Sequence, residues 1–159
     1  MFNKILIPLD ESPLSEQALP VAIEMAKQFK SELILLQAVP PVTMTITDLG
    51  GSGMENPTMT TLAIENARAL EANNVKAATV YIERKVQEAR SAGIKVSPSV
   101  FNDTPAKAIL DVCKNEGVDL IIITTHGRSG LGRAIVGSVA DHVIRHAGIP
   151  VMVIRPKHS

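Results

Sequence analysis

Aromatic residues are scarce in this chain: Trp is absent, and one Tyr and three Phe make up 3% of the 159 residues. So few rings argue against a stacking platform for single-stranded nucleic acid. The chain also has no surplus of charge, because 16 Lys and Arg balance 16 Asp and Glu. Proteins that bind nucleic acid usually carry excess basic charge. We therefore expect no nucleic-acid partner, and a core that is built from aliphatic side chains.

Cysteine and long apolar runs are also missing. The one cysteine, Cys113, cannot form an intramolecular disulfide, so nothing points to an oxidising compartment. No apolar run approaches the roughly 18 residues that are needed to cross a bilayer, and no signal peptide precedes the first apolar run. We expect a cytoplasmic protein without membrane insertion, in which Cys113 is an inert buried thiol.

What the chain does have is a series of short apolar runs separated by helical patterns. Hydrophobic residues make up 45% of the sequence, and its length fits a single domain over residues 1–159. Runs that are apolar at every position are typical of strands covered on both faces. Strands that alternate with helices predict a doubly wound α/β fold with a five-stranded parallel sheet. The five runs are residues 5–9, 33–36, 94–96, 120–123 and Val151–Ile154.

Helix start and stop signals lie between these runs. Ser12 and Pro13 are suited to begin the first helix, and Pro20 should bend it. Residues 60–92 have a helical pattern that Asn73-Asn74 could divide in two, and both readings stay open. A third helix is predicted from Pro105 to Glu116 with Thr104 as its cap, and a fourth starts near Gly137.

A long connection, residues 40–61, follows the second predicted strand. It is rich in Thr, Met, Gly and Pro, and contains the run Gly50-Gly51-Ser52-Gly53. A connection of this length inside a compact domain is usually a functional lid or a disordered segment. Because it follows the carboxyl end of a strand, it lies where open α/β sheets bind their ligands.

The stretch from Thr124 to Val139 carries most of the recognisable chemistry. It leads from an apolar strand into a helix, which is the context that a phosphate-binding loop requires. Gly127 removes a side chain where an anion could approach, and Arg128 adds positive charge. Gly137 and Ser138 fall at the helix start, where unpaired N–H groups and the helix dipole favour an anion.

Two well-known phosphate loops do not fit this stretch. The P-loop pattern requires a Lys after its last glycine, but Ser138 follows Gly137. The dinucleotide fingerprint requires three glycines after the first strand, where Asp10-Glu11-Ser12-Pro13 stands instead. From the residues alone, a glycine-rich turn that binds no ligand remains an open alternative.

The chain resembles the universal stress protein family in its ATP-binding branch. The resemblance covers nearly the whole sequence, including Asp119 to Gly127 and the stretch from Gly137-Ser138 to Val151. The family's phosphate loop reads Gly, two residues, Gly, nine residues, Gly, then Ser or Thr. Gly127, Gly137 and Ser138 match that pattern, whereas Thr124 replaces the first glycine. The resemblance implies the strand order 3-2-1-4-5 and helices on both faces of the sheet.

Carried over residue by residue, the family's nucleotide site falls at the ends of several strands. Asp10 would contact the adenine or ribose, and the chain near Ala38 would bind the adenine through its backbone. Thr124, Gly137 and Ser138 would hold the ribose and phosphates. The loop residues and the end of the first strand complete the implied site, namely Pro8, His126, Gly127, Arg128 and Gly130. Asp10 also has a simpler interpretation, as a residue that shapes the entry to the first helix.

The resemblance implies an ATP-binding sensor or regulator rather than a fast enzyme. A placed general base, a P-loop Lys and a carboxylate pair for Mg²⁺ are not recognisable in the sequence, so Mg²⁺ would arrive with the phosphates. Slow ATP hydrolysis or self-phosphorylation stays possible, and the regulatory protein partner is unknown. The apolar last strand, Val151–Ile154, would pair with its copy in a homodimer.

Two alternatives from other classes stay beside this hypothesis. Thr124, in place of glycine, favours a dimeric interaction module of the same fold that binds no nucleotide. An adenylating or pyrophosphatase-type enzyme would require a glycine-rich loop after the first strand, and ranks last. Separately, His142 and His146 lie four residues apart and could share a metal, but we expect them to be surface residues near a helix end.

Overall fold

The computed structural model describes residues 2–43, 57–125 and 136–155. Most of the long connection and the predicted loop residues His126, Gly127, Arg128 and Gly130 lie outside these ranges. The elements, in chain order, are β1 (Lys4–Pro8), α1 (Pro13–Glu16), α2 (Ala18–Phe29), β2 (Glu32–Ala38), α3 (Pro57–Arg90), β3 (Val96–Phe101), α4 (Pro105–Glu116), β4 (Leu120–Thr124), α5 (Ser138–His146) and β5 (Val151–Ile154).

The five strands form one parallel sheet in the order β3-β2-β1-β4-β5. This order confirms the predicted fold class and strand arrangement. The strand order reverses between β1 and β4, which lie side by side although more than 100 residues separate them. The carboxyl ends of β1 and β4 therefore meet at one edge of the sheet.

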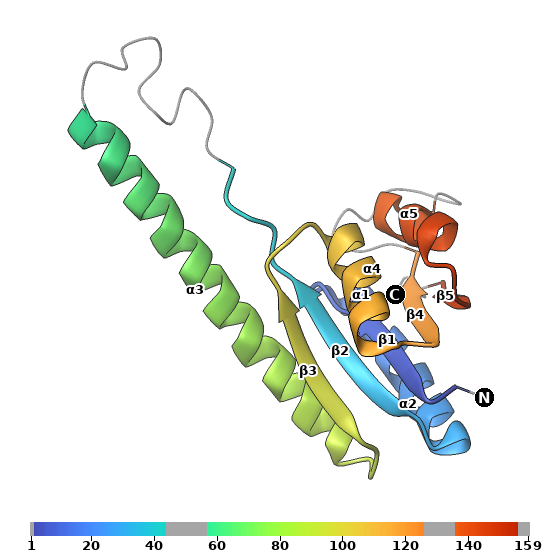
Figure 1. Cartoon of the computed structure of the whole chain (residues 1–159). Coiled ribbons are helices and arrows are strands. Elements are labelled where there is room, and N and C mark those ends of the chain that lie inside the picture. The colour runs from blue at the N-terminus through green and yellow to red at the C-terminus, as the bar shows by residue number, and fades with distance from the viewer. Residues whose placement is uncertain (1, 44–56, 126–135, 156–159) are drawn as a thin grey trace.

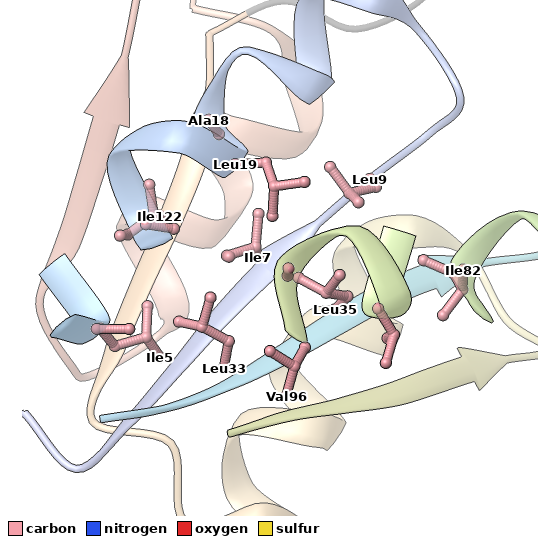
Figure 2. Packing of buried hydrophobic residues seen from close by; sticks show 14 of the residues in the cluster. Ile5, Ile7, Leu9, Ala18, Leu19, Leu33, Leu35, Ile82, Val96 and Ile122 are labelled. Carbon is pink, nitrogen blue, oxygen red and sulfur yellow. The ribbon is translucent and has the colours of Figure 1, made fainter. Parts of the chain in front are cut away.

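Both faces of the sheet are buried, as the uninterrupted apolar runs predict. On one face, Ile5, Ile7, Leu33, Leu35 and Ile122 pack against α2 and α3 (Figure 2). On the other face, alternate strand residues such as Leu6 and Ile34 pack against α4 and α5. Because successive side chains of a strand point to opposite faces, a strand covered twice has to be apolar throughout.

The third strand differs from the prediction. The apolar run at residues 94–96 predicts a short strand there, but β3 spans Val96–Phe101. Its sequence, VSPSVF, alternates polar residues with apolar ones and contains Pro98, which hides the strand signal. β3 lies at an edge of the sheet, paired only with β2, and edge strands tolerate proline.

The first predicted helix is two helices in the structure. Ser12 and Pro13 begin α1 as predicted, but the chain breaks at Gln17, before α2 starts at Ala18. Pro20 has no N–H to donate to the carbonyl of Glu16, and its ring crowds that carbonyl. The break therefore falls one turn ahead of the proline instead of at the proline itself.

The helical pattern of residues 60–92 corresponds to a single helix, Pro57–Arg90, which settles the open question at Asn73-Asn74. The helix begins inside the predicted connection 40–61, so that connection is shorter than predicted. α3 has 34 residues and is therefore about 51 Å long. Its C-terminal half packs on the sheet through Ala78, Ile82 and Val86, whereas none of residues 60–77 is buried. Figure 1 shows α3 lying along β3 and continuing beyond the ends of the strands. Among the described residues, no helix combines the length and apolarity needed to cross a membrane.

The remaining helix signals are confirmed with one difference. α4 runs from Pro105 to Glu116 and ends at Gly117, whose φ of 64° is left-handed. Thr104 occupies the cap position, but its side chain makes no capping hydrogen bond. Instead, the Thr104 N–H donates to Asp103 Oδ1 at 2.7 Å.

A partly buried polar contact joins α1 to α3 beside the apolar core. Glu16 Oε1 accepts from the Tyr81 hydroxyl at 2.9 Å, and Glu16 Oε2 accepts from Lys85 Nζ at 2.7 Å. Burial acts to raise the pKa of Glu16, but the hydrogen bonds from Lys85 and Tyr81 outweigh it and hold this pKa below 4.5. Burial and the hydrogen bond to Glu16 both raise the pKa of Tyr81. Folding thus favours the ionised form of Glu16.

We expect the Glu16 contact to give a pH-dependent part of the stability. Because its pKa is lowered in the folded state, the contribution is complete above the unfolded pKa and is lost as pH falls through the folded value. Glu16→Gln should therefore reduce the free energy of unfolding at pH 7 by more than it does at pH 3, as measured by urea denaturation. Glu88→Gln is the matched control, since Glu88 is a more exposed partner of Lys85. A Glu16→Gln deficit that does not change with pH would contradict this assignment.

Candidate functional site

A cavity of about 370 Å³ lies at the carboxyl ends of β1, β2 and β4. It is bounded by the last residues of these strands, the chain that leads into α1, and the starts of α4 and α5. Open α/β sheets bind ligands at the point where the strand order reverses, and here that point is the junction of β1 and β4. The cavity thus coincides with the place that the topology favours.

The structure brings six of the predicted site residues together around this cavity. They come from four separate parts of the chain and are Pro8, Asp10, Ala38, Thr124, Gly137 and Ser138. The other predicted site residues, His126, Gly127, Arg128 and Gly130, lie outside the described residues. Residues more than 100 positions apart in the sequence therefore share one cavity, as the predicted strand order requires.

The cavity combines an apolar wall with polar groups. Leu36, Ile109 and Ile123 supply aliphatic surface to the wall. Asp10, Ser15, Thr124, Thr125 and Ser138 contribute hydroxyl or carboxylate groups. Apolar walls with a few convergent polar groups are typical of small-molecule sites. The arrangement suits a ligand that has one flat apolar part and one polar part.

The entry to α1 holds Asp10 in place. Asp10 Oδ1 accepts from the Ser12 hydroxyl at 2.6 Å and from the Ser12 N–H at 3.1 Å. Ser12 Oγ in turn accepts from the Ser15 N–H at 3.0 Å, which caps α1. Ser15 Oγ donates to the Ser12 carbonyl at 2.9 Å. The simpler interpretation of Asp10 as a helix-entry residue is thus correct, and it does not conflict with a place in the cavity wall.

Glu11, the next residue, has an unusual backbone conformation. Its φ is 65°, in the left-handed region that few residues other than glycine adopt. The Glu11 carboxylate accepts from Gln37 Nε2 at 2.6 Å, which connects this turn to the end of β2. Gln37 is buried, and its Oε1 has no hydrogen-bond partner within the part of the chain that the structure describes. Strained turns of this kind often accompany functional sites.

Gly137 allows α5 to begin directly against β4. The Gly137 N–H donates to the Thr125 carbonyl at 2.7 Å. A Cβ at position 137 would lie 2.7 Å from the same carbonyl oxygen, closer than real Cβ contacts allow. The glycine therefore has a packing role whether or not a ligand binds. The first N–H groups of α5 have no acceptor within the helix. They lie at the edge of the cavity, because α5 begins at Ser138, which lines it.

Sequence reasoning missed the residues that line the cavity from α1 and α4. Ser15 lies in α1, whereas Pro105 and Ile109 belong to α4. For Pro105 the sequence offers one signal. It is the predicted start of α4, which follows the carboxyl end of β3 and therefore lies at the edge of the sheet where the cavity opens. That Ile109 faces the cavity follows only from the packing of α4 over the sheet.

A second and more open hollow, of about 550 Å³, lies on the surface of α3 beside Glu11. Lys76, Tyr81 and Arg84 line it, and the Arg84 guanidinium lies 5.6 Å from the centre of the Tyr81 ring. Apart from Glu11, all of its lining residues come from one convex helix, so it can enclose little of a ligand. We therefore take the cavity at the strand ends as the candidate site, although it has the smaller volume.

Cys113 offers no chemistry to the site. It is buried on α4, and burial raises the pKa of its thiol to about 11. The thiolate is the reactive form of cysteine, so this side chain is unreactive at neutral pH, as predicted.

Comparison with known proteins agrees with this architecture. The sequence pattern of the universal stress protein family matches residues 1–155. The chain belongs to the universal stress protein family. Universal stress protein YxiE of Bacillus subtilis is 30% identical over 155 residues, which cover 98% of this chain and 100% of that protein.

Solved structures of the family share the whole fold. Universal stress protein MJ0577 of Methanocaldococcus jannaschii is 29% identical over 168 residues, covering 100% of this chain and 98% of that protein. The solved structure of MJ0577 superposes on this chain with a TM-score of 0.81. The superposition covers 100% of this chain and 99% of the MJ0577 chain. A family member from Arabidopsis thaliana with AMP bound has a TM-score of 0.65 at 17% identity, covering 98% of this chain and 92% of the other. At that identity the likeness shows the fold alone.

Gly137→Ala should destabilise the protein, because the added methyl group overlaps the Thr125 carbonyl and opens the hydrogen bond at the start of α5. Overpacking of this kind costs about 1–3 kcal/mol. Urea denaturation followed by circular dichroism measures the loss. Ser138→Ala is the control and should stay within about 0.5 kcal/mol, because the Ser138 side chain is exposed. Equal stability of both variants would contradict the packing role of Gly137.

Proposed function

We propose that this chain binds ATP in the cavity at the ends of β1, β2 and β4 and acts as a nucleotide-dependent regulator. The observation that carries the proposal is the joining of Asp10, Ala38, Thr124 and Gly137-Ser138 around one cavity. The apolar wall fits a purine, and the start of α5 supplies N–H groups for an anion. Two solved relatives are described as bound to AMP and to cAMP, which supports an adenine nucleotide as the ligand class.

The assignment of parts follows the chemistry of the cavity. The adenine lies against the wall near Ala38, and Asp10 contacts the adenine or ribose. The phosphates extend along Thr124 to Ser138, toward the loop that contains His126, Gly127, Arg128 and Gly130. The basic Arg128 favours a ligand that carries phosphate. Pro8 completes the wall at the end of β1.

Mg²⁺ accompanies the phosphates in this proposal. Among the described residues that line the cavity, Asp10 is the one carboxylate. Within the described ranges, no group of three or more His, Cys, Asp or Glu side chains could hold a metal ion. Mg²⁺ is commonly bound by substrate phosphates with few protein ligands, so the cavity fits a cation that is brought by the nucleotide. The residues that could face it are Asp10, Thr124 and Ser138.

We infer at most slow hydrolysis or self-phosphorylation. Among the lining residues that the structure describes, none is a His, Lys or Glu that could activate an attacking water, and Asp10 Oδ1 is engaged by Ser12. Phosphoryl transfer relies on positioned charge and an oriented nucleophile, and the described part of the cavity offers little of either. Regulation through nucleotide-dependent contacts is the better match.

A dimeric interaction module that binds no nucleotide is the second candidate. Thr124, which replaces a glycine of the family's loop, is the observation that favours it. The experiment that separates the two candidates is to denature freshly purified protein and to identify any released nucleotide by chromatography. ATP or ADP in a near-equal ratio to protein would support the first candidate. A failure to bind added Mg·ATP in calorimetry would favour the second.

Substitutions should distinguish the part of the site that binds the phosphates from the part that binds the adenosine. Ser138→Ala should weaken ATP binding by about 1–3 kcal/mol, because it removes a donor to charged phosphate, and should leave adenosine binding unchanged. Gly127→Val should block the phosphates. Asp10→Ala should weaken both ATP and adenosine. Isothermal titration calorimetry measures each affinity.

Ser91→Ala is the control for the Ser138 change. The Ser91 hydroxyl donates to the Glu88 carbonyl near the end of α3, and Ser91 is not among the cavity residues. This variant should bind ATP as the unaltered chain does. Unchanged ATP affinity in both Ser138→Ala and Gly127→Val would overturn the phosphate assignment.

A homodimer through β5 completes the proposal. β5 is an edge strand and is partly exposed along its length, with Val153 37% exposed. An apolar edge strand tends to pair with another strand. A two-fold axis beside β5 would pair the free backbone N–H and C=O groups of this edge in both copies.

Light scattering at micromolar concentration should therefore give twice the chain mass of 17.0 kDa. Val153→Lys should give the mass of the single chain, because it places a charge on the paired edge. Val80→Lys, which alters an exposed apolar residue on α3, should leave the dimer intact. A single-chain mass for the unaltered protein would refute pairing through β5.

A further inference from the structure

His142 and His146 form a pair on the exposed face of α5, one helical turn apart. Both side chains are exposed, their ring centroids lie 4.2 Å apart, and the ring planes are inclined by only 25°. Two imidazole nitrogens that bind one Zn²⁺ at about 2.0–2.1 Å can lie at most about 4 Å apart. The rings are stacked and exposed, so a rotation of the His142 side chain would bring one nitrogen from each ring within reach of one shared cation.

The hydrogen bonding of His146 prepares it as a metal ligand. Its Nδ1 lies 2.8 Å from the His142 carbonyl oxygen. A carbonyl can only accept, so Nδ1 carries the hydrogen and Nε2 of the neutral ring keeps its lone pair for a metal. Metal-binding histidines usually donate their second ring N–H to a carbonyl or carboxylate in this way, which sets both the tautomer and the ring orientation.

The surroundings of the pair also favour a cation. Arg145 lies between the two histidines in sequence, but its Nε is paired with Asp141 at 2.9 and 3.1 Å, so its charge is compensated. His146 is the last residue of α5, where the helix dipole attracts positive charge. The described residues provide no third His, Cys, Asp or Glu for a common site, so water or another molecule would fill the remaining positions.

We propose that His142 and His146 form a two-ligand surface site for a late first-row divalent cation, namely Zn²⁺, Ni²⁺ or Cu²⁺. Imidazole pairs select these ions, whereas Mg²⁺ and Ca²⁺ prefer oxygen ligands. The site is distinct from the cavity: Ser138 borders the cavity at the start of α5, and His146 lies at the other end, about 12 Å along the helix. It does not depend on nucleotide binding.

The test is calorimetric titration of the full chain with ZnCl₂. We expect one Zn²⁺ per chain in the unaltered protein, and binding weaker by about ten-fold or more in His142→Ala and in His146→Ala, a loss of about 1.4 kcal/mol or more. His158→Ala removes a histidine from outside the pair and should leave the affinity unchanged. MgCl₂ should give no binding to this site.

A second readout separates loss of the site from loss of the fold. Because the cation binds the folded helix, saturating Zn²⁺ should raise the midpoint of thermal unfolding of the unaltered protein but not of the two variants. Without metal all of the proteins should unfold alike, since both histidines are exposed. Zn²⁺ affinity that stays the same in either variant, or no Zn²⁺ binding to the unaltered chain, would overturn the proposal.

Discussion

Burial of the sheet on both faces is the constraint on which the rest of this protein depends. Aliphatic side chains fill the space between the strands and four helices, where burial of a polar group without a partner is costly. The polar chemistry therefore gathers where the strands end. Because the strand order reverses between β1 and β4, two of these ends lie side by side, and the cavity opens there.

The short segment from Asp10 to Glu16 connects the candidate cavity with α3. Asp10 and Ser15 line the cavity, while Glu16, at the end of the same segment, accepts from Tyr81 and Lys85 of α3. Glu11 connects the segment to β2 through Gln37. One wall of the candidate site is thus connected by hydrogen bonds to α3, which covers the face of the sheet opposite to α4 and α5.

Much of this architecture could be predicted from the sequence because its signals are local. Apolar runs found four strands, and the cap at Ser12 and the stop at Gly117 marked helix ends correctly. β3 was misplaced because Pro98 and its alternating pattern reflect an edge position that only the assembled sheet reveals. The family resemblance named six of the residues that line the cavity. Ile109 could not be found, because its approach to the cavity depends on how α4 packs.

The long α3 has a consequence for the hydrodynamics of the chain. The helix measures about 51 Å, whereas β3 beside it, with six residues, covers about 20 Å. The protruding half makes the molecule elongated (Figure 1). An elongated particle tumbles and diffuses more slowly than a sphere of equal mass, so it elutes early in gel filtration. A single chain of this shape would then imitate a larger globular species on a column, whereas scattered light intensity reports mass independently of outline.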